Sequence, residues 1–237
     1  MKCYYDDKEF GRIMIFVRRG AKVMKFGWKD GVAQMTVPYG VPSADVLNMI
    51  DTNREKIRLL NRGGVSFSDG QVIPCFRASI TISTDARLRN QVTYGRRPDD
   101  AASMYVHVPA DVDFGSATVK RGISSVISKL LADAALRILI PYAWAEAGRL
   151  GLHPLRFEIG RGKRKLGHCT GEGVIQLSRF LMLMPQPLVQ CVVCHELAHL
   201  THHDHSPEFY ALLNTYLDGR RAELDQQIDR FSWPIMR

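Results

Sequence analysis

The first 60 residues alternate between apolar and polar positions before changing to a helical spacing. The alternating segments cover residues 12–19, 22–30 and 32–38. Because alternation places apolar side chains on one face of a strand, these segments predict a small sheet. Asp30-Gly31 between the second and third segments is typical of a hairpin turn. From Ser43 to about Leu60, apolar residues recur three and four apart, which predicts a helix capped by Ser43.

Residues 61–121 have a less regular pattern. Two strands are predicted, at Val72 to Thr84 and at Ala102 to Val108, with a loop from Arg96 to Asp100 between them. A basic cluster is formed by Arg87, Arg89, Arg96 and Arg97. It can meet phosphate, but a solvated loop is the preferred interpretation of such a cluster. No chemistry is assigned to this region.

A long helical pattern follows, from Ser124 to Leu152. Ser124 or Ser125 is its expected cap, and Gly151 closes it. Pro141 lies inside the pattern, where proline removes a helical hydrogen bond and crowds the preceding turn. The helix should therefore kink or split there.

The last 85 or so residues mix short strands with helices. Strands are predicted at residues 155–159 and 174–178, and Gly171 and Gly173 predict a hairpin turn. Helices are predicted from Pro187, from Pro207 to Leu217 and from Arg220 to Arg230. The whole pattern predicts an α+β fold with an N-terminal β-rich region containing one helix, residues 1–115, and a second region at 116–237.

Composition agrees with a soluble globular chain, since 46% of residues are apolar and 24% are charged. No apolar run is long enough to cross a bilayer, and residues 1–10 are too polar and acidic for a signal peptide. A cytoplasmic protein with no membrane partner is expected. The five cysteines, at positions 3, 75, 169, 191 and 194, should be free thiols in that compartment. A second zinc at Cys191 and Cys194 would need two more ligands, so packing of buried thiols is preferred.

The net charge of +8 reflects 32 basic against 24 acidic side chains. It favours anionic partners such as nucleic acid, nucleotides or acidic peptides. Bulk charge alone does not choose among them.

The chemistry centres on residues 191–213, CVVCHELAHLTHHDHSPEFYALL, which contain the motif H-E-x-x-H. Residues four apart on a helix lie nearly one above the other, so His195 and His199 can direct both imidazoles at one ion. Glu196 lies one step round the helix, too far to bind the same ion but well placed to take a proton from water there. This division of roles is typical of a metal-dependent hydrolase.

His205 is the candidate third ligand, six residues after His199. The spacing equals that of the metzincin pattern H-E-x-x-H-x-x-G-x-x-H, in which the glycine lets the chain turn back to the metal. Because His202 occupies the glycine position here, we expect the turn later, at His203, Asp204 or Ser206.

A new helix is predicted immediately after this turn. Ser206, Pro207 and Glu208 match an N-cap, a first-turn proline and a first-turn acid. The competing interpretation of the stretch is a histidine-rich helix end whose imidazoles are solvated. For His202 and His203 that interpretation is preferred.

These residues resemble the YgjP-like metallopeptidase family, small H-E-x-x-H proteins related in layout to the SprT-like proteases. The family's V-V-x-H-E-L-x-H-L, N-H-S and F-W stand here as VVCHELAHL, DHS and EFY. The N-terminal order of a V-R-R strand, a hairpin, T-V-P and a helix is also similar. The resemblance implies a zincin-like catalytic region at 116–237, a zinc ion held by His195, His199 and His205, and Glu196 as acid/base.

One loop departs from the family's pattern. The family's R-W-G-S-C corresponds to residues 165–169, KLGHC, and Ser178 replaces the asparagine of its I-x-L-N strand. These changes leave the substrate undecided. His168 is a candidate for substrate contact or a further ligand, and Lys165 is a candidate cation for a developing oxyanion. Asp204 is a candidate hydrogen-bond partner of a ligand histidine, with a turn-forming role as the equal alternative.

The sequence therefore predicts metal-assisted hydrolysis with one zinc, or another divalent metal, per chain. A metallopeptidase acting on peptide or protein is the first hypothesis. The second is a nucleoside triphosphate pyrophosphohydrolase, which the family resemblance also implies. The third is a recruited nucleic-acid-associated protein with a vestigial site, against which Glu196 argues because metal binding alone does not need it.

Overall fold

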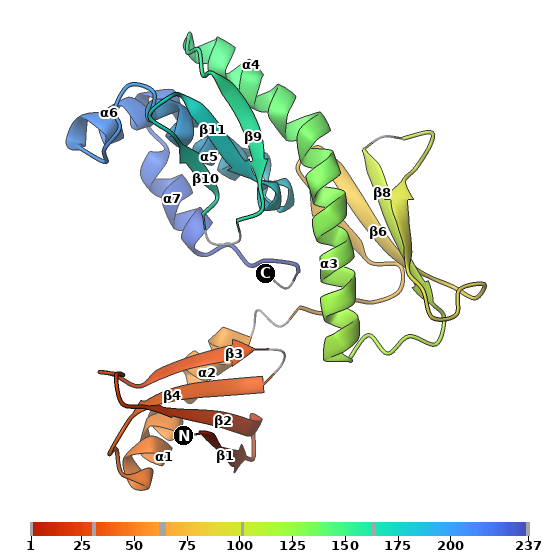
Figure 1. Cartoon of the computed structure of the whole chain (residues 1–237), viewed down its shortest axis with the longest axis vertical. Helices are drawn as coiled ribbons and strands as arrows, with labels where there is room; N and C mark the ends of the chain where they lie inside the picture. Colours follow the sequence, from red (N-terminus) through yellow and green to blue (C-terminus); the bar gives the residue numbers. More distant parts are fainter. Residues whose placement is uncertain (1, 30–31, 62–64, 101, 163–164, 236–237) are drawn as a thin grey trace. The chain divides into compact units, whose positions relative to one another are not determined.

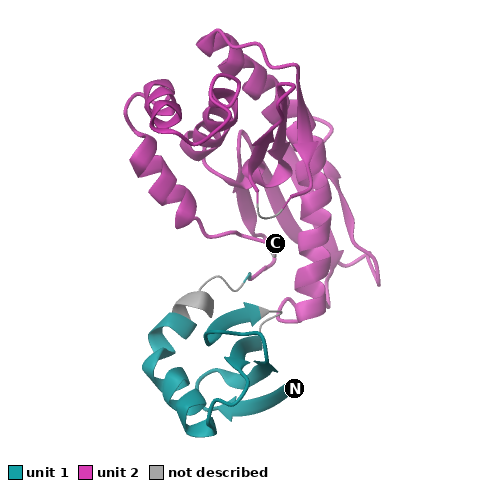
Figure 2. Cartoon of the chain, turned by 60° about the vertical axis from the view of Figure 1, so that its left-hand side comes forward, with its two compact units in different colours: residues 1–65 teal, residues 66–237 magenta. Residues whose placement is uncertain are grey.

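A computed structural model describes residues 2–29, 32–61, 65–100, 102–162 and 165–235. The described chain forms two compact units, Met1–Val65 and Ser66–Arg237 (Figure 2). Helices and small sheets occur in both, which confirms the α+β prediction. The compact units divide between Val65 and Ser66, and the strands of residues 72–109 pack with later helical segments of the second unit. The division of the chain into regions at 115/116 stays a prediction.

Unit 1 is built on a four-stranded sheet in the order β1-β2-β4-β3 (Figure 1). Its strands are β1 (Lys2–Asp7), β2 (Gly11–Arg18), β3 (Lys25–Lys29) and β4 (Val32–Pro38). The last three confirm the predicted strands, whereas β1 was not predicted. β3 and β4 are antiparallel, as a hairpin requires, and the predicted Asp30-Gly31 turn lies outside the described residues.

Two helices cover one face of this sheet, α1 (Ser43–Thr52) and α2 (Arg54–Asn61). The predicted single helix is thus interrupted at Asn53, whose side-chain amide donates to the Met49 carbonyl at 2.9 Å. Alternate strand residues and the helices bury the core, as the pattern predicted. Its buried members are Ile13, Ile15, Ala33, Met35, Val37, Val46, Ile50 and Ile57.

Unit 2 begins with a second four-stranded sheet, in the order β5-β6-β8-β7 (Figure 1). Its strands are β5 (Val72–Cys75), β6 (Ala78–Asp85), β7 (Thr93–Arg96) and β8 (Ser103–Pro109). The prediction of one strand over residues 72–84 was wrong, because Phe76 and Arg77 form a turn. Phe76 is drawn inward, where its N–H donates to the Met182 carbonyl at 2.6 Å, and Arg77 takes a left-handed φ of 52°.

The two four-stranded sheets share one topology. In each, the first two strands are antiparallel, the second and fourth are parallel, and the third and fourth are antiparallel. The parallel pairs even end alike, with Arg18 opposite Pro38 and Asp85 opposite Pro109. Position by position, the buried Ile13 and Ile15 of β2 correspond to the buried Ile80 and Ile82 of β6. We interpret the two sheets as an internal structural repeat.

A long helical segment follows the second sheet. It consists of α3 (Ala117–Ala134), a π-helical turn (Ala135–Leu139) and α4 (Ile140–Leu150). The predicted break at Pro141 is confirmed, because the wide turn lies where a proline ring would crowd the preceding carbonyls. The helix starts earlier than predicted, after Ser116, and Ser124 is buried within it. Gly151 ends the segment with a φ of 67°, as predicted.

A third, three-stranded sheet has the order β10-β11-β9. It contains β9 (Arg156–Gly160), β10 (Gly167–Cys169) and β11 (Val174–Ser178). β9 and β11 confirm the predicted strands and pair in parallel, whereas β10 was not predicted and forms a hairpin with β11 around the predicted turn at Gly171 and Gly173. A 3₁₀ turn (Arg179–Leu183) leads to α5 (Gln186–Ala198), α6 (Pro207–Tyr216) and α7 (Arg221–Asp229). These helices confirm the three C-terminal predictions. Among the described residues, none of the helices has the length and apolar character needed to span a membrane.

Candidate metal centre

Helix α5 carries the H-E-x-x-H motif at its C-terminal end. Pro187 lies in the first turn, where its missing N–H costs no helical hydrogen bond. The middle of the helix is buried on nearly all sides, since the four consecutive residues Cys191, Val192, Val193 and Cys194 are all buried. His195 projects from the last turn and His199 caps the helix. Both are half-buried.

His205 returns to this helix end through a short turn. After the end of α5, the His202 N–H donates a hydrogen bond to the Ala198 carbonyl at 3.0 Å. Ser206 then caps α6, its hydroxyl accepting a hydrogen bond from the Phe209 N–H at 3.3 Å. The predicted cap, proline and new helix are confirmed, and His205 is fixed one residue before them.

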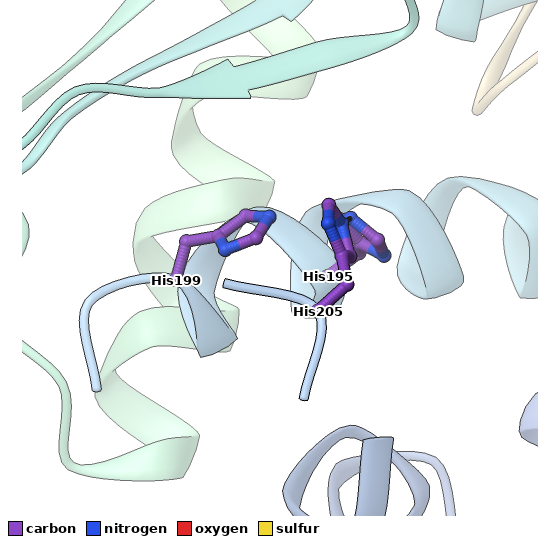
Figure 3. Close-up of side chains that lie close together, drawn as sticks. All are labelled: His195, His199 and His205. Carbon is purple, nitrogen blue, oxygen red and sulfur yellow. Dashed lines mark hydrogen bonds between the residues drawn. The ribbon is translucent and has the colours of Figure 1, made fainter. Parts of the chain in front are cut away.

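The three imidazoles converge on one point (Figure 3). The nitrogens offered by His195, His199 and His205 lie within 4.8 Å of one another, and the Nε2 atoms of His195 and His205 are 3.1 Å apart. The ring of Phe209 lies 5.0, 4.6 and 4.9 Å from those of His195, His199 and His205. This fully buried ring therefore packs against all three imidazoles.

The donor set fits a zinc ion. In tetrahedral coordination, zinc–nitrogen bonds of about 2.1 Å separate two nitrogens on one ion by about 3.4 Å, and the 3.1 Å between the Nε2 atoms of His195 and His205 is close to that value. Three protein ligands leave a fourth position for water or substrate, which is typical of catalytic rather than structural zinc sites.

The protonation states of the histidines also suit metal binding. Burial, and then the neighbouring imidazoles, lower the pKa of His195 to about 4. His199 Nδ1 lies 3.0 Å from the His202 carbonyl. Because a carbonyl only accepts, this nitrogen carries the proton and leaves Nε2 with a free lone pair for a metal.

Glu196 lies on a different side of α5 and is buried, with 6% of its surface exposed. Burial raises the pKa of its carboxyl group to about 7, while the positive charge of Lys165 opposes that rise. The side chain lies against the backbone of β10. A Cβ atom added at Gly167 would overlap Glu196 Oε1 and lie 2.6 Å from its carboxyl carbon. The missing side chain of Gly167 thus provides the space that the carboxyl group occupies.

Lys165 and His168 flank this glycine, and both are exposed. Lys165 acts on the charge of Glu196, and His168 on that of His199, whose pKa is lowered chiefly by burial. The loop that departs from the family pattern therefore contributes charge next to the histidine cluster.

Asp204 and Ser178 have mainly structural contacts. Asp204 is exposed, and hydrogen bonds from Ser206 lower the pKa of its carboxyl group. These contacts correspond to the turn-forming alternative. Ser178 is buried, donates to the Gly162 carbonyl at 2.8 Å and accepts from the Phe180 N–H at 3.3 Å. It thereby closes the loop before β10 and caps the 3₁₀ turn.

The opposite side of α5 is held by α4. Glu146 accepts hydrogen bonds from Arg149 Nε at 2.9 Å and from Gln190 Nε2 at 3.3 Å. Cys191 and Cys194 are buried on this side, and burial, with nearby carboxylates, raises the pKa of each thiol to about 12. Such thiols stay protonated at neutral pH, which agrees with packing rather than metal binding.

Sequence reasoning missed two residues that shape the centre, Phe209 and Gly167. Phe209 contacts all three imidazoles, which the pattern of apolar residues does not indicate. Gly167 is the position of KLGHC that keeps the family's glycine while its neighbours change. That retention was the available signal.

Comparison with protein families gives one finding that covers most of the chain. The model of the YgjP-like family, described as a metallopeptidase domain, matches residues 24–230. Neither the curated proteins nor the solved structures give a match.

Proposed function

The chain belongs to the YgjP-like metallopeptidase family and is therefore a metal-dependent hydrolase, and we propose that it is a zinc-dependent peptidase acting through Glu196. The observation that carries this proposal is the position of Glu196. The carboxyl group is buried against an edge strand of a small sheet, on the residue that follows the candidate ligand His195 in helix α5. A metal-storage or structural site has no need of such a carboxyl group.

The metal would be held by His195, His199 and His205. A zinc ion bound there supplies Lewis acidity, which lowers the pKa of water and polarises a scissile carbonyl. Glu196 takes the proton from the attacking water and returns it to the leaving amine. A pKa near neutrality suits both halves of that exchange, because the group must accept and then release a proton.

The edge strand β10 gives the peptide a place to bind. β10 pairs with β11 on one side only in the order β10-β11-β9, and it packs against α5. An extended peptide can add to such an edge by backbone hydrogen bonds. The scissile bond would then pass near Glu196, with Lys165 as the nearby cation for the developing negative charge.

The test compares substrates and one matched variant. The zinc-loaded chain is incubated with a mixed peptide library, analysed by mass spectrometry, and separately with nucleoside triphosphates, analysed for released pyrophosphate. We expect peptide cleavage that Glu196→Gln reduces by about 10³-fold or more, with zinc content unchanged. Unchanged turnover in that variant would remove Glu196 from the mechanism.

Nucleotide turnover without peptide cleavage would replace the peptide as substrate and leave the metal chemistry intact. The proposed location stays cytoplasmic, as the sequence predicted. Zinc is the proposed metal because three imidazoles are among its common catalytic ligand sets.

A further inference from the structure

The sheet of unit 1 has two faces of different character. α1 and α2 cover one face (Figure 1). The register places a second set of side chains together on the opposite face. Within unit 1 no described helix packs on that face, and its Tyr4 is 60% exposed. The face is formed by Lys2, Tyr4, Asp6, Arg12, Met14, Phe16, Arg18, Lys25, Gly27, Gln34 and Thr36.

This outer face is basic. Four exposed cations, Lys2, Arg12, Arg18 and Lys25, stand against the single carboxylate of Asp6. Asp6 is paired with Arg12 at 2.9 Å. Three other acids of the unit, Asp7, Glu9 and Asp51, are bound by Arg54. Arg54 neutralises one of these three charges, and none of the three acids belongs to the outer face.

The charge is concentrated in unit 1 as a whole. Residues 1–65 contain 12 Lys and Arg against 7 Asp and Glu, a net of +5 out of the +8 of the chain. The remaining 172 residues contain 20 against 17, a net of +3. The smaller unit thus carries most of the net positive charge.

Aromatic rings lie among these cations. The Arg12 guanidinium is 4.4 Å from the ring centre of Tyr4, and Lys2 Nζ is 5.8 Å from that of Phe16. Flat rings beside cations on an open sheet are the elements with which proteins stack bases and hold phosphates of single-stranded nucleic acid. A membrane surface is a poorer fit, because the apolar side chains of Met14 and Phe16 are half-buried.

The internal repeat supplies a matched comparison. By register, Arg12, Phe16 and Lys25 correspond to Ser79, Ser83 and Thr93 of the second sheet. The described strand residues on that second outer face include no Lys or Arg: they are Val72, Pro74, Ser79, Thr81, Ser83, Asp85, Thr93, Gly95, Ser103, Tyr105, His107 and Pro109. A solvated outer face of this topology therefore does not require cations.

We propose that the outer face of the unit 1 sheet binds single-stranded nucleic acid. Lys2, Arg12, Arg18 and Lys25 contact phosphates, and Tyr4, with Phe16 beside it, stacks against bases. The proposed site belongs to unit 1 and the histidine cluster to unit 2, and the two sites share no residue.

Fluorescence anisotropy with a labelled oligothymidine of about 12 nucleotides tests this on the full chain. For Arg18→Gln with Lys25→Gln, we expect at least about a 10-fold weaker affinity at low salt. The slope of log affinity against log salt should fall by about 1.4, the contribution of two single-strand phosphates. Tyr4→Ser should weaken binding several-fold with the slope unchanged, because stacking involves no counterion release.

A charge-matched control is the double variant Arg89→Gln with Arg97→Gln, which removes two exposed cations from unit 2. It should retain wild-type affinity, and all variants should keep the wild-type melting temperature. An equal loss of affinity in this control would show that binding depends only on the net charge of the chain and would overturn the proposal. So would the absence of wild-type binding at low salt, or stronger binding to anionic lipid vesicles that is lost in the unit 1 variants.

Discussion

The two four-stranded sheets have the same strand order and the same pairing directions, but their surroundings differ. The second sheet is followed by α3, which packs on β7 and β8 and continues through the π-helical turn into α4. α4 in turn packs against the histidine-bearing α5. The first sheet is followed only by the short α1 and α2, which complete its own core.

The same sheet topology therefore has a different role in each unit. The second sheet is tied, through a continuous helical segment, to the elements that place His195 and Glu196. The described strand residues on its outer face include no Lys or Arg. The first sheet has no such connection within its unit, and its outer face carries cations and rings. Changes in unit 2 should therefore alter the metal centre, whereas changes in unit 1 should leave hydrolysis unaffected.

The largest effect is expected when the Phe209 ring is removed from unit 2. Phe209→Ala should lower the free energy of unfolding of unit 2 by about 3–5 kcal/mol, because a fully buried ring is removed. It should also weaken zinc binding, since the ring supports all three ligands. Thermal unfolding and zinc titration measure the two effects. Tyr210→Ala, at the partly exposed neighbouring position, is the control, and an equal effect there would remove the special role of Phe209.

The next effect concerns the space beside Glu196. Gly167→Ala should reduce hydrolysis by about 100-fold, equivalent to about 2.7 kcal/mol, because the new methyl group displaces the carboxyl group. Zinc content should stay unchanged. Gly171→Ala is the matched control, since a Cβ atom there meets nothing within 4 Å. Full activity of Gly167→Ala would show that Glu196 needs no such clearance.

The smallest effect lies in unit 1. Asp7 is buried, and its hydrogen bonds with Arg54, at 2.9 Å for the closest pair, lower its pKa from 3.8 to about 2. After allowance for the solvent around Arg54, this pair contributes about 1–2 kcal/mol at neutral pH. Asp7→Asn should destabilise unit 1 by that amount and leave hydrolysis unchanged.

The contribution of Asp7 to stability should depend on pH. A carboxyl group whose pKa is lowered by folding stabilises the fold above its unfolded pKa, and that contribution is lost as pH falls through the folded value. The difference between wild type and Asp7→Asn should be full at pH 7, decline below about pH 4 and vanish near pH 2. Urea unfolding followed by the fluorescence of Trp28, which is the only tryptophan of unit 1, measures it. A constant difference would contradict the ion-pair explanation.

The convergence of the histidines was predictable because it depends on local geometry. Helical spacing places His195 and His199 on one face of α5. The Ser206 cap fixes where α6 begins and therefore where His205, the preceding residue, lies. The clearance at Gly167 was not predictable from spacing, because it depends on β10 approaching α5 from a distant part of the chain. The same holds for Phe209, whose helical pattern shows only that it is buried.

The fold shows the same limit. Alternation predicted β2, β3 and β4, and Pro141 predicted the break before α4. The turn at Phe76-Arg77 escaped prediction because arginine is uncommon at a left-handed φ and no glycine or asparagine marks the turn. The repeat was also hidden, because equivalent core positions share apolar character while their outer-face residues differ.

Metal content per chain tests the central claim most directly. Elemental analysis would be performed on protein purified without chelators or an affinity tag, for wild type, His199→Ala and the control His203→Ala, an exposed histidine outside the cluster. We predict about one zinc per chain in wild type and in His203→Ala, and almost none in His199→Ala. Wild-type protein that takes up no zinc on titration, or a His199→Ala variant that retains it, would contradict the assignment of this cluster as the metal centre.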